Sequence, residues 1–399
     1  MFVQILIALM FGIVAGTFTG LIPGIHVNLI SILVLSATGN ITGISPLIII
    51  TFIISMALTH TFVDSIPSIF LGAPDGDQIL SVLPGHKMLL AGQGYNAVKL
   101  TVIGSLFGLL LATLLIPFLI TTFPNIYEFI KKYIALLIVI IVIIMILTES
   151  KKLKALFQFL LAGTLGLIVL SAANLKHPLL GMLSGLFGIS TLIVSLQNKV
   201  VIPKQKTQSE LGVTKSVVAR ATGISVFSGG TVALLPGLGS AQAGILGSYL
   251  AGDLGDKGFL ILIGGINTVN MIVSLLTFYT IDKTRNGAVV VVKEIIKQIN
   301  LNQLFLLLAV GLIVGGLATL LTLHLAKTAA SYITKINYRK ICFFIITFVS
   351  LVVFLFSGFF GLMIMIISAA IGILPSYTGV KKSHNLGCLL LPVILWMVL

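Results

Sequence analysis

Two polar side chains, His60 and Asp64, stand at the end of an apolar stretch that spans residues 42–63. A carboxylate within a membrane-spanning segment is costly to bury and is a functional candidate by default, as a proton carrier or a cation ligand. Their spacing places His60 and Asp64 on one face of a helix, where the two groups can titrate as a pair. The alternative is that Asp64 ends a helix at the membrane surface.

Two amides occupy the corresponding part of the second half of the chain. Asn267 and Asn270 lie in an otherwise apolar stretch at a spacing that gives them a common helix face, and their carbonyl oxygens can coordinate a cation. The alternative is that they form hydrogen bonds between helices. The sequence therefore predicts an ion-coupling site for Na⁺ or H⁺, and its candidate residues are His60, Asp64, Asn267 and Asn270.

A break in apolar sequence occurs twice. Residues 16–24 read GTFTGLIPG and residues 229–237 read GGTVALLPG; a Pro-Gly pair interrupts a helix because proline lacks an N–H and glycine tolerates unusual backbone angles. A helix that restarts after such a break directs unpaired N–H groups and its positive dipole end toward it, which favours anions. The candidate substrate-binding residues are Gly20, Pro23, Gly24, His26, Asn28, Pro236, Gly237, Gly239, Ser240 and Gln242.

Each break taken alone has an alternative explanation, a kink that lets helices pack closely. Two breaks in corresponding places of two halves are instead the pattern expected around a transporter's binding site. The sequence contains no His/Cys cluster with metal-ligand spacing and no Walker loop, which are the patterns that would indicate a metal site or ATP hydrolysis. We expect no enzyme activity, no catalytic or metal-binding residues, and no cofactor besides the coupling ion.

The composition is that of an integral membrane protein. Of the 399 residues, 58% are hydrophobic and 9% charged, and the mean hydropathy is +1.19, whereas a soluble domain carries about 25% charged residues. Long apolar stretches predict an all-α, multi-pass protein of the plasma membrane rather than a barrel. The net charge of +14 comes from basic residues scattered in short loops, which favours membrane lipids as partners and argues against nucleic acid.

The predicted spans fall into two sets that keep the same order of landmarks. They are expected at residues 2–22, 42–63, 98–122, 134–149, 155–173 and 180–197, and at 221–236, 259–281, 303–325, 341–357, 360–374 and 387–399. A shift of 213 residues aligns the two breaks, with Pro23 on Pro236. We expect two structural repeats, residues 1–198 and 221–399, joined by a basic linker at 199–220. They should supply about 10–12 membrane segments that include broken or re-entrant helices, which favour an inverted arrangement.

The chain resembles the large membrane subunit of tripartite tricarboxylate transporters over most of its length. The motifs that carry the resemblance are GLIPG at 20–24, SIPSIF at 65–70, PGHKMLLAGQGYNA at 84–97 and LPG at 235–237. It implies a twofold-repeated helical architecture, ion-coupled carriage of carboxylates, and a small membrane subunit and an external solute-binding protein as partners. The departures, among them the acids Asp64, Asp75 and Asp77, indicate a divergent, archaeal-type branch.

We therefore expect an ion-coupled secondary transporter of an anionic, carboxylate-type solute, working by alternating access and assembled as a homodimer. Its site would lie between the half-helix ends of the two repeats. One alternative is a flippase for a lipid-linked phosphate, since the helix ends suit a phosphate headgroup equally well. Another is a membrane enzyme acting on lipid phosphates, with His60 or His26 as base and Asp64 as partner. A structural scaffold is least favoured, because duplicated breaks have no packing rationale.

Overall fold

The computed structural model describes residues 1–22, 27–38, 43–72, 82–130, 132–172, 175, 178–197, 202–207, 210–234, 240–284, 286–333 and 338–398. All regular secondary structure within these ranges is helical. The first half contains α1 (Phe2–Leu21), α2 (Val27–Thr38), α3 (Pro46–Val63), α4 (Ser65–Phe70), α5 (Val82–Leu90), α6 (Gly94–Ile130), α7 (Ile134–Leu147), α8 (Lys152–Ser171), α9 (Pro178–Leu183), the π-helix η2 (Ser184–Ile189) and α10 (Ser190–Gln197). The second half contains α11 (Lys215–Leu234), α12 (Ser240–Ala251), α13 (Gly255–Ile281), α14 (Gly287–Ile296), α15 (Leu301–Tyr332), α16 (Tyr338–Thr378), the 3₁₀-helix η4 (Lys382–Leu386) and α17 (Gly387–Val398).

Among the described residues, eight helices are long and apolar enough to cross a membrane. The prediction of an all-α integral membrane protein is therefore confirmed. Four shorter helices, α2, α5, α12 and α14, lie between the predicted spans, and α11 begins at Lys215, so the last residues of the predicted linker are helical. The backbone leaves the helical region at Gly358 in α16, with φ 65° and ψ −164°, where the sequence predicts the boundary between two spans.

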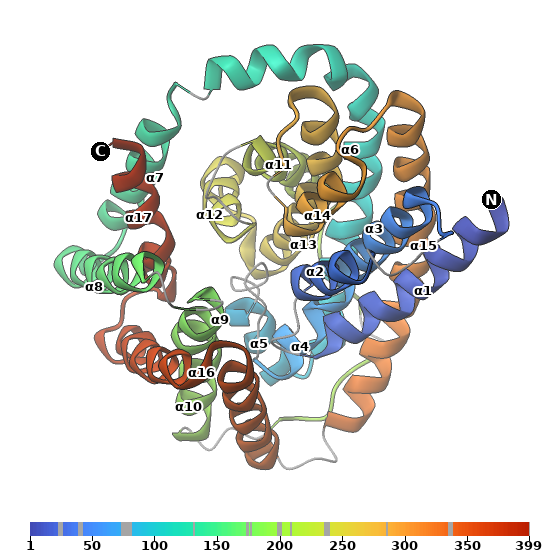
Figure 1. Cartoon of the computed structure of the whole chain (residues 1–399). Helices are drawn as coiled ribbons and strands as arrows, with labels where there is room; N and C mark the ends of the chain where they lie inside the picture. The colour runs from blue at the N-terminus through green and yellow to red at the C-terminus, as the bar shows by residue number, and fades with distance from the viewer. Residues whose placement is uncertain are drawn as a thin grey trace.

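The described helices form two bodies, and each body draws on both halves of the chain (Figure 1). The large body comprises α1–α6 and α11–α15; the small body comprises α7–α10 and α16–α17 with η2 and η4. Within the part of the chain that the structure describes, every extensive helix–helix packing lies inside one body or the other. The chain passes from the large body into the small one twice, after α6 and after α15.

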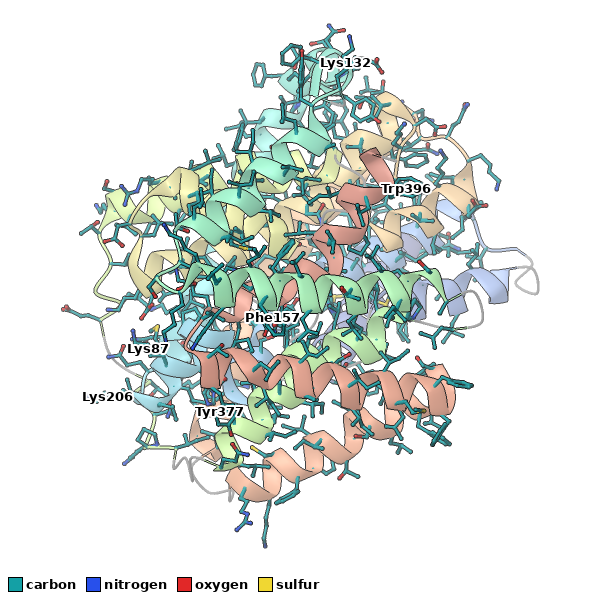
Figure 2. The ribbon with its side chains drawn as sticks, turned by 90° about the vertical axis from the view of Figure 1, so that its left-hand side faces the viewer. Lys87, Lys132, Phe157, Lys206, Tyr377 and Trp396 are labelled. Carbon is teal, nitrogen blue, oxygen red and sulfur yellow. The ribbon has the colours of Figure 1, made fainter. Side chains whose placement is uncertain are left out.

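The outer surface of the small body is apolar. Figure 2 shows Phe157 in the first half of α8, while Lys87, Lys206 and Tyr377 lie toward one end of the helices. Phe157 and Trp396 are 62% and 80% exposed. A large apolar side chain exposed on a long apolar helix is expected to face lipid, and the end marked by the two lysines is expected to lie near a membrane surface.

The centre of the large body consists of α3 and α13, which are almost completely buried. Helix α1 packs along α3 in the same direction, with Gly12, Gly16 and Gly20 facing residues 52–64. Small residues let two backbones approach closely, which is the main source of helix association where no water is present to drive it.

Helices from opposite halves pack on each other across this centre. Helix α6 lies along α13, where Gly104 sits against the carbonyl of Ile261. The hydroxyl of Ser105 donates to the carbonyl of Gly264 at 3.0 Å. Helix α15 lies along α3 in turn. The two halves are thus intertwined and do not form separate globules.

In the small body, too, helices from opposite halves of the chain pack on each other. Helix α8 packs on α17, with Gly166 against the carbonyl of Cys388. Helix α16 packs on η2, with Gly372 against the carbonyl of Leu186. Both contacts leave no room for a side chain on the glycine.

Helices α11 and α12 form a hairpin around the second break. A Cβ on Gly247 of α12 would lie 3.0 Å from the hydroxyl oxygen of Ser228 on α11, and these two positions are nearly equidistant in sequence from residues 235–239. Because α11 also packs along α13 and only three residues separate α12 from α13, α12 returns toward the end of the bundle from which α11 started.

Replacing Gly104 with alanine should destabilise the protein. The new Cβ would overlap the carbonyl oxygen of Ile261, and overpacking of this kind costs about 1–3 kcal/mol. Gly316 of α15 has open space around it, so Gly316→Ala should instead be neutral or stabilising by up to about 1 kcal/mol, as expected for a permissive helix site. Thermal unfolding of both variants in detergent measures the difference, and equal stability would contradict the close crossing.

Candidate functional site

Asp64 occupies the turn between α3 and α4 and is 2% exposed. Its amide donates to the carbonyl of His60 at 3.0 Å, and its own carbonyl accepts from the hydroxyl of Ser68 at 2.8 Å. The backbone thus continues from one helix into the next with Asp64 deep inside the large body. Asp64 therefore ends α3 in the interior of the protein and is shielded from solvent.

The Asp64 carboxylate meets an amide from the other half of the chain. Nδ2 of Asn267, on α13, donates to Oδ2 of Asp64 at 2.8 Å, across 203 residues of sequence. Asn267 is 4% exposed. The sequence predicts an ion-coupling role for each of the two residues on separate grounds, and the fold brings them into contact.

The end of α1 lies beside His60 and the backbone of Asp64. Nδ1 of His60 is 3.1 Å from the hydroxyl oxygen of Thr19. A Cβ on Gly20 would lie 3.2 Å from the backbone nitrogen of Asp64. The first break in the sequence therefore begins next to the buried acid, because α1 ends at Leu21.

Side-chain oxygen atoms are abundant along α3 and α13. The hydroxyls of Thr61 and Thr268 lie 3.1 Å apart and join α3 to α13. Elsewhere on the same two helices, buried side-chain oxygens of Ser55, Thr59 and Asn270 make no hydrogen bond to any residue that the structure describes. Hydroxyl, amide and carboxylate oxygens are the ligands that hard cations such as Na⁺ or Ca²⁺ take, so the residues present fit a cation.

Several predicted substrate-binding residues cannot be placed in the same way. Those outside the described residues are Pro23, Gly24, His26, Pro236, Gly237 and Gly239, and the side chain of Gln242 is likewise outside them. Asn28 lies on α2, where its amide contacts Gly287 of α14. Ser240 begins α12, is fully buried, and its hydroxyl has no hydrogen-bond partner among the described residues.

Comparison with known proteins identifies the family. The sequence profile of the family described as "Tripartite tricarboxylate transporter TctA family" matches residues 6–387. The chain belongs to this family. A TctA-family transporter with eight candidate spans is a multi-pass protein, placed in the plasma membrane. Membership also agrees with the prediction that the chain is not an enzyme.

One curated relative spans nearly the whole chain. It is "Uncharacterized protein MJ1079" of Methanocaldococcus jannaschii, 29% identical over 413 aligned positions that cover 98% of this chain and 99% of the relative. Similarity to an archaeal protein agrees with the archaeal-type branch of the TctA family that the departures indicate. No solved structure matches the chain.

Sequence reasoning missed the hydroxyl groups of the site. Thr19, Thr61 and Thr268 all contact it or its neighbours, and each looks like an ordinary small residue in an apolar helix. The available signal is spacing: Thr61 follows His60 directly, and Thr268 follows Asn267. Once the packing face of α3 or α13 is known, the residue next to a buried polar side chain can be expected to point toward another adjacent helix.

A second polar cluster, which the sequence did not lead us to expect, lies in the small body. Nε2 of the fully buried His384 is 3.2 Å from Oε2 of Glu149, and the amide of Lys381 donates to the same oxygen at 3.4 Å. Nearby, Nε2 of Gln158 donates to Oδ1 of Asn385 at 2.6 Å. These contacts connect α8 and the turn before it to η4.

The pKa values of this cluster are shifted in the same direction. Burial acts to raise the pKa of Glu149, but the hydrogen bonds from His384 and the Lys381 amide outweigh it and hold that pKa below its usual range. Burial lowers the pKa of His384 more than the nearby Glu149 carboxylate raises it. The folded protein therefore favours a neutral imidazole beside an ionised carboxylate.

Acid should destabilise the protein through this pair. As the pH falls, the unfolded chain takes up a proton on His384 near pH 6.5 and on Glu149 near pH 4.5, before the folded protein does. The contribution of this pair to the free energy of unfolding is therefore complete above these values and is lost as the pH falls below them. His384→Gln keeps an N–H donor but does not titrate, so its unfolding temperature should change less between pH 7.5 and 5.5 than that of the wild type. The exposed His324→Gln serves as control; an unaltered pH response in His384→Gln would contradict the assignment.

Proposed function

We propose that this TctA-family protein is an ion-coupled secondary transporter of an anionic, carboxylate-type solute. The observation that carries the proposal is the buried hydrogen bond between Asp64 and Asn267. An ionised carboxylate in a desolvated interior is costly unless it is paired or coordinates a cation. A transported Na⁺ or H⁺ at this position offsets that cost during part of the cycle.

The coupling cation is proposed to bind among the oxygens at the Asp64–Asn267 contact. Asp64 supplies the negative charge, and the buried side-chain oxygens of Asn270 and Thr59 have no hydrogen-bond partner among the described residues. His60, next to Thr19 at the end of α1, provides a second titratable group. Ion binding here would act on the end of α1, next to the first break.

The anionic solute is proposed to bind at the two breaks. Ser240 supports this assignment, because its buried hydroxyl is unpaired within the described residues and lies in the first turn of the twelve-residue α12. A helix start carries free N–H groups and a positive dipole end that attract carboxylates. The first break begins beside Asp64, which would couple solute and cation binding through one segment.

Two repeats are proposed to frame the site, and the glycine contacts support them. Gly16 faces Met56 and Thr59 of α3, and Gly229 faces Ile266 and Val269 of α13. A shift of 213 residues therefore relates α1 to α11, and one of 210 residues relates α3 to α13. Further glycines at close crossings pair in the same way, namely Gly104 with Gly311, Gly108 with Gly315, Gly166 with Gly372 and Gly185 with Gly387.

The contact between Asp64 and Asn267 favours inverted repeats. Under the shift of 210 residues, the counterpart of Asp64 is Ser274, seven residues after Asn267. In parallel repeats Asp64 and Ser274 would lie at one depth, leaving Asn267 about 10 Å away along the helix at 1.5 Å per residue. Their side chains are 2.8 Å apart. Antiparallel α3 and α13 can make this contact near the membrane centre.

Alternating access is proposed to arise from movement of the large body against the small body. The helix packing among described residues is extensive within each body and slight between them, so relative motion breaks few close contacts. The family's tripartite name supports a small membrane subunit and a solute-binding protein as partners, and a homodimer in the lipid bilayer is proposed as the assembly.

Asp64→Asn should abolish ion coupling. The variant keeps the size of the side chain but loses the charge, and loss of a charged hydrogen-bonding group weakens binding roughly tenfold or more. Uptake of labelled citrate, succinate or orthophosphate into proteoliposomes, driven by a Na⁺ or H⁺ gradient, measures the effect. Asp256→Asn, which removes an exposed acid paired with Lys87, should leave uptake unchanged. Gradient-driven uptake by Asp64→Asn at the wild-type rate would contradict the proposal.

Single cysteines should report the inverted arrangement. Ser45 precedes α3 and Asp253 precedes α13, and both are exposed. In inverted repeats, an impermeant maleimide should label Ser45→Cys and Asp253→Cys from opposite sides of the membrane; parallel repeats give labelling from the same side. The native Cys342 and Cys388 are buried and are replaced by serine in the background.

A further inference from the structure

Four exposed lysines lie together on the small body, where α8 begins and where the chain leaves α16. They are Lys151, Lys152, Lys154 and Lys381, here called the lysine cluster. Nζ of Lys151 donates to the carbonyl of Thr378 at 2.9 Å, across 227 residues of sequence. The amide of Lys381 donates to Oε2 of Glu149 at 3.4 Å, across 232 residues. Two separate contacts therefore bring the two lysine-bearing segments together.

No acid neutralises the lysine cluster among the residues that the structure describes. The acid beside it, Glu149, is 8% exposed and lies 3.2 Å from the buried His384. Lys151 has a structural role, since a cation is favourable at the C-terminal end of a helix such as α16. Lys152 and Lys154 stand instead in the first turn of α8, which holds no acid and where a cation is unfavourable. Helix stability therefore does not explain their presence.

An exposed apolar stripe runs along α8 from the lysine cluster. Leu153, Phe157 and Ile168 are 82%, 62% and 65% exposed, and their spacing of four and eleven residues places them on one helix face. Tyr377, next to Thr378 at the end of α16, is 69% exposed. An apolar helix face of this kind is expected to meet lipid, and tyrosine is common where lipid gives way to water. The lysine cluster is therefore expected at the depth of the lipid headgroups.

We propose that the lysine cluster binds the phosphate headgroup of an anionic lipid whose acyl chains lie along the apolar stripe of α8. Basic residues clustered directly beside a membrane-spanning helix attract anionic headgroups. A lipid fits better than a soluble anion, because Leu153 stands between Lys152 and Lys154 and apolar and basic side chains leave the same turn. A soluble anion would contact the lysines and leave the stripe uncovered.

The bound lipid would join two segments that are distant in sequence. The lysines of α8 and Lys381 would share one headgroup, which adds to the contact between Lys151 and Thr378. The attraction falls off within about 10 Å of the membrane surface at ordinary salt, so it would hold the small body at a fixed depth in the bilayer. This site is separate from the central cation site and does not depend on the proposed transport function.

A single tryptophan beside the lysine cluster can report the lipids around it. The one tryptophan of the chain, Trp396, is 80% exposed and lies well away from Tyr377 in Figure 2. Trp396→Phe combined with Tyr377→Trp moves the reporter to the cluster and leaves the charge unchanged. The full-length protein is reconstituted into bilayers of phosphatidylcholine and brominated phosphatidylglycerol in varied ratio. Quenching of the fluorescence then gives the relative affinity of the two lipids at the reporter.

Phosphatidylglycerol should be preferred beside the cluster, and the preference around Trp396 in the wild type should be smaller. Each lysine near the surface adds about fivefold to the binding of an anionic lipid, so Lys381→Gln should lower the preference about fivefold. Replacing Lys152, Lys154 and Lys381 together with glutamine should remove most of it. The matched control removes as many exposed charges from the linker and the start of α11, by glutamine at Lys204, Lys206 and Lys215, and should keep the preference.

The two triple variants carry the same net charge, so a difference between them reports the lysine cluster itself. If the triple variant of the cluster does not fold, Lys381→Gln alone takes its place. The inference is overturned if the reporter at position 377 shows no preference for phosphatidylglycerol, or if the cluster and control variants lose the preference equally. No transport is measured, so either result leaves the proposed transport function untouched.

Discussion

Close contact between glycines and neighbouring backbones is the constraint on which this structure depends. Lipid is as apolar as a leucine side chain, so helices in a membrane gain little from burying apolar surface and associate mainly through tight packing and hydrogen bonds. The crossings at Gly104, Gly166 and Gly372 place helix backbones so near that a methyl group has no room. Each joins one half of the chain to the other, so the intertwined arrangement follows from them.

These helix crossings also determine where the buried polar side chains lie. Because α6 and α15 each pack on the central helix of the opposite half, α3 and α13 are enclosed on all sides, and Asp64 meets Asn267 away from water. A carboxylate that is easily solvated titrates near pH 4 and has no need of a coupling ion. Enclosure makes its charge expensive, which is why the coupling cation is proposed to bind there.

Much of this was predictable from sequence, and the reasons for the failures are physical. The spans were predictable because membrane helices must satisfy their backbone internally, and Asp64 and Asn267 because polar groups in such spans are few. The hydroxyls of Thr61 and Thr268 were not, since a threonine that bonds its own helix is indistinguishable in sequence from one that faces another. The two bodies were not predictable either, because exchange between the halves is decided by crossings far apart in the chain.

The proposed repeats agree in their packing and differ in their chemistry. Gly16 and Gly104 have glycine counterparts in Gly229 and Gly311, as expected where helices pack closely. Asp64, in contrast, corresponds to Ser274, and His60 to Asn270. One proposed copy therefore carries the titratable groups and the other carries neutral amides, and the proposed cation site lies where these unlike faces meet. A symmetric pair of carboxylates would repel at this distance, so divergence of the halves permits one buried acid to be held by the amide opposite it.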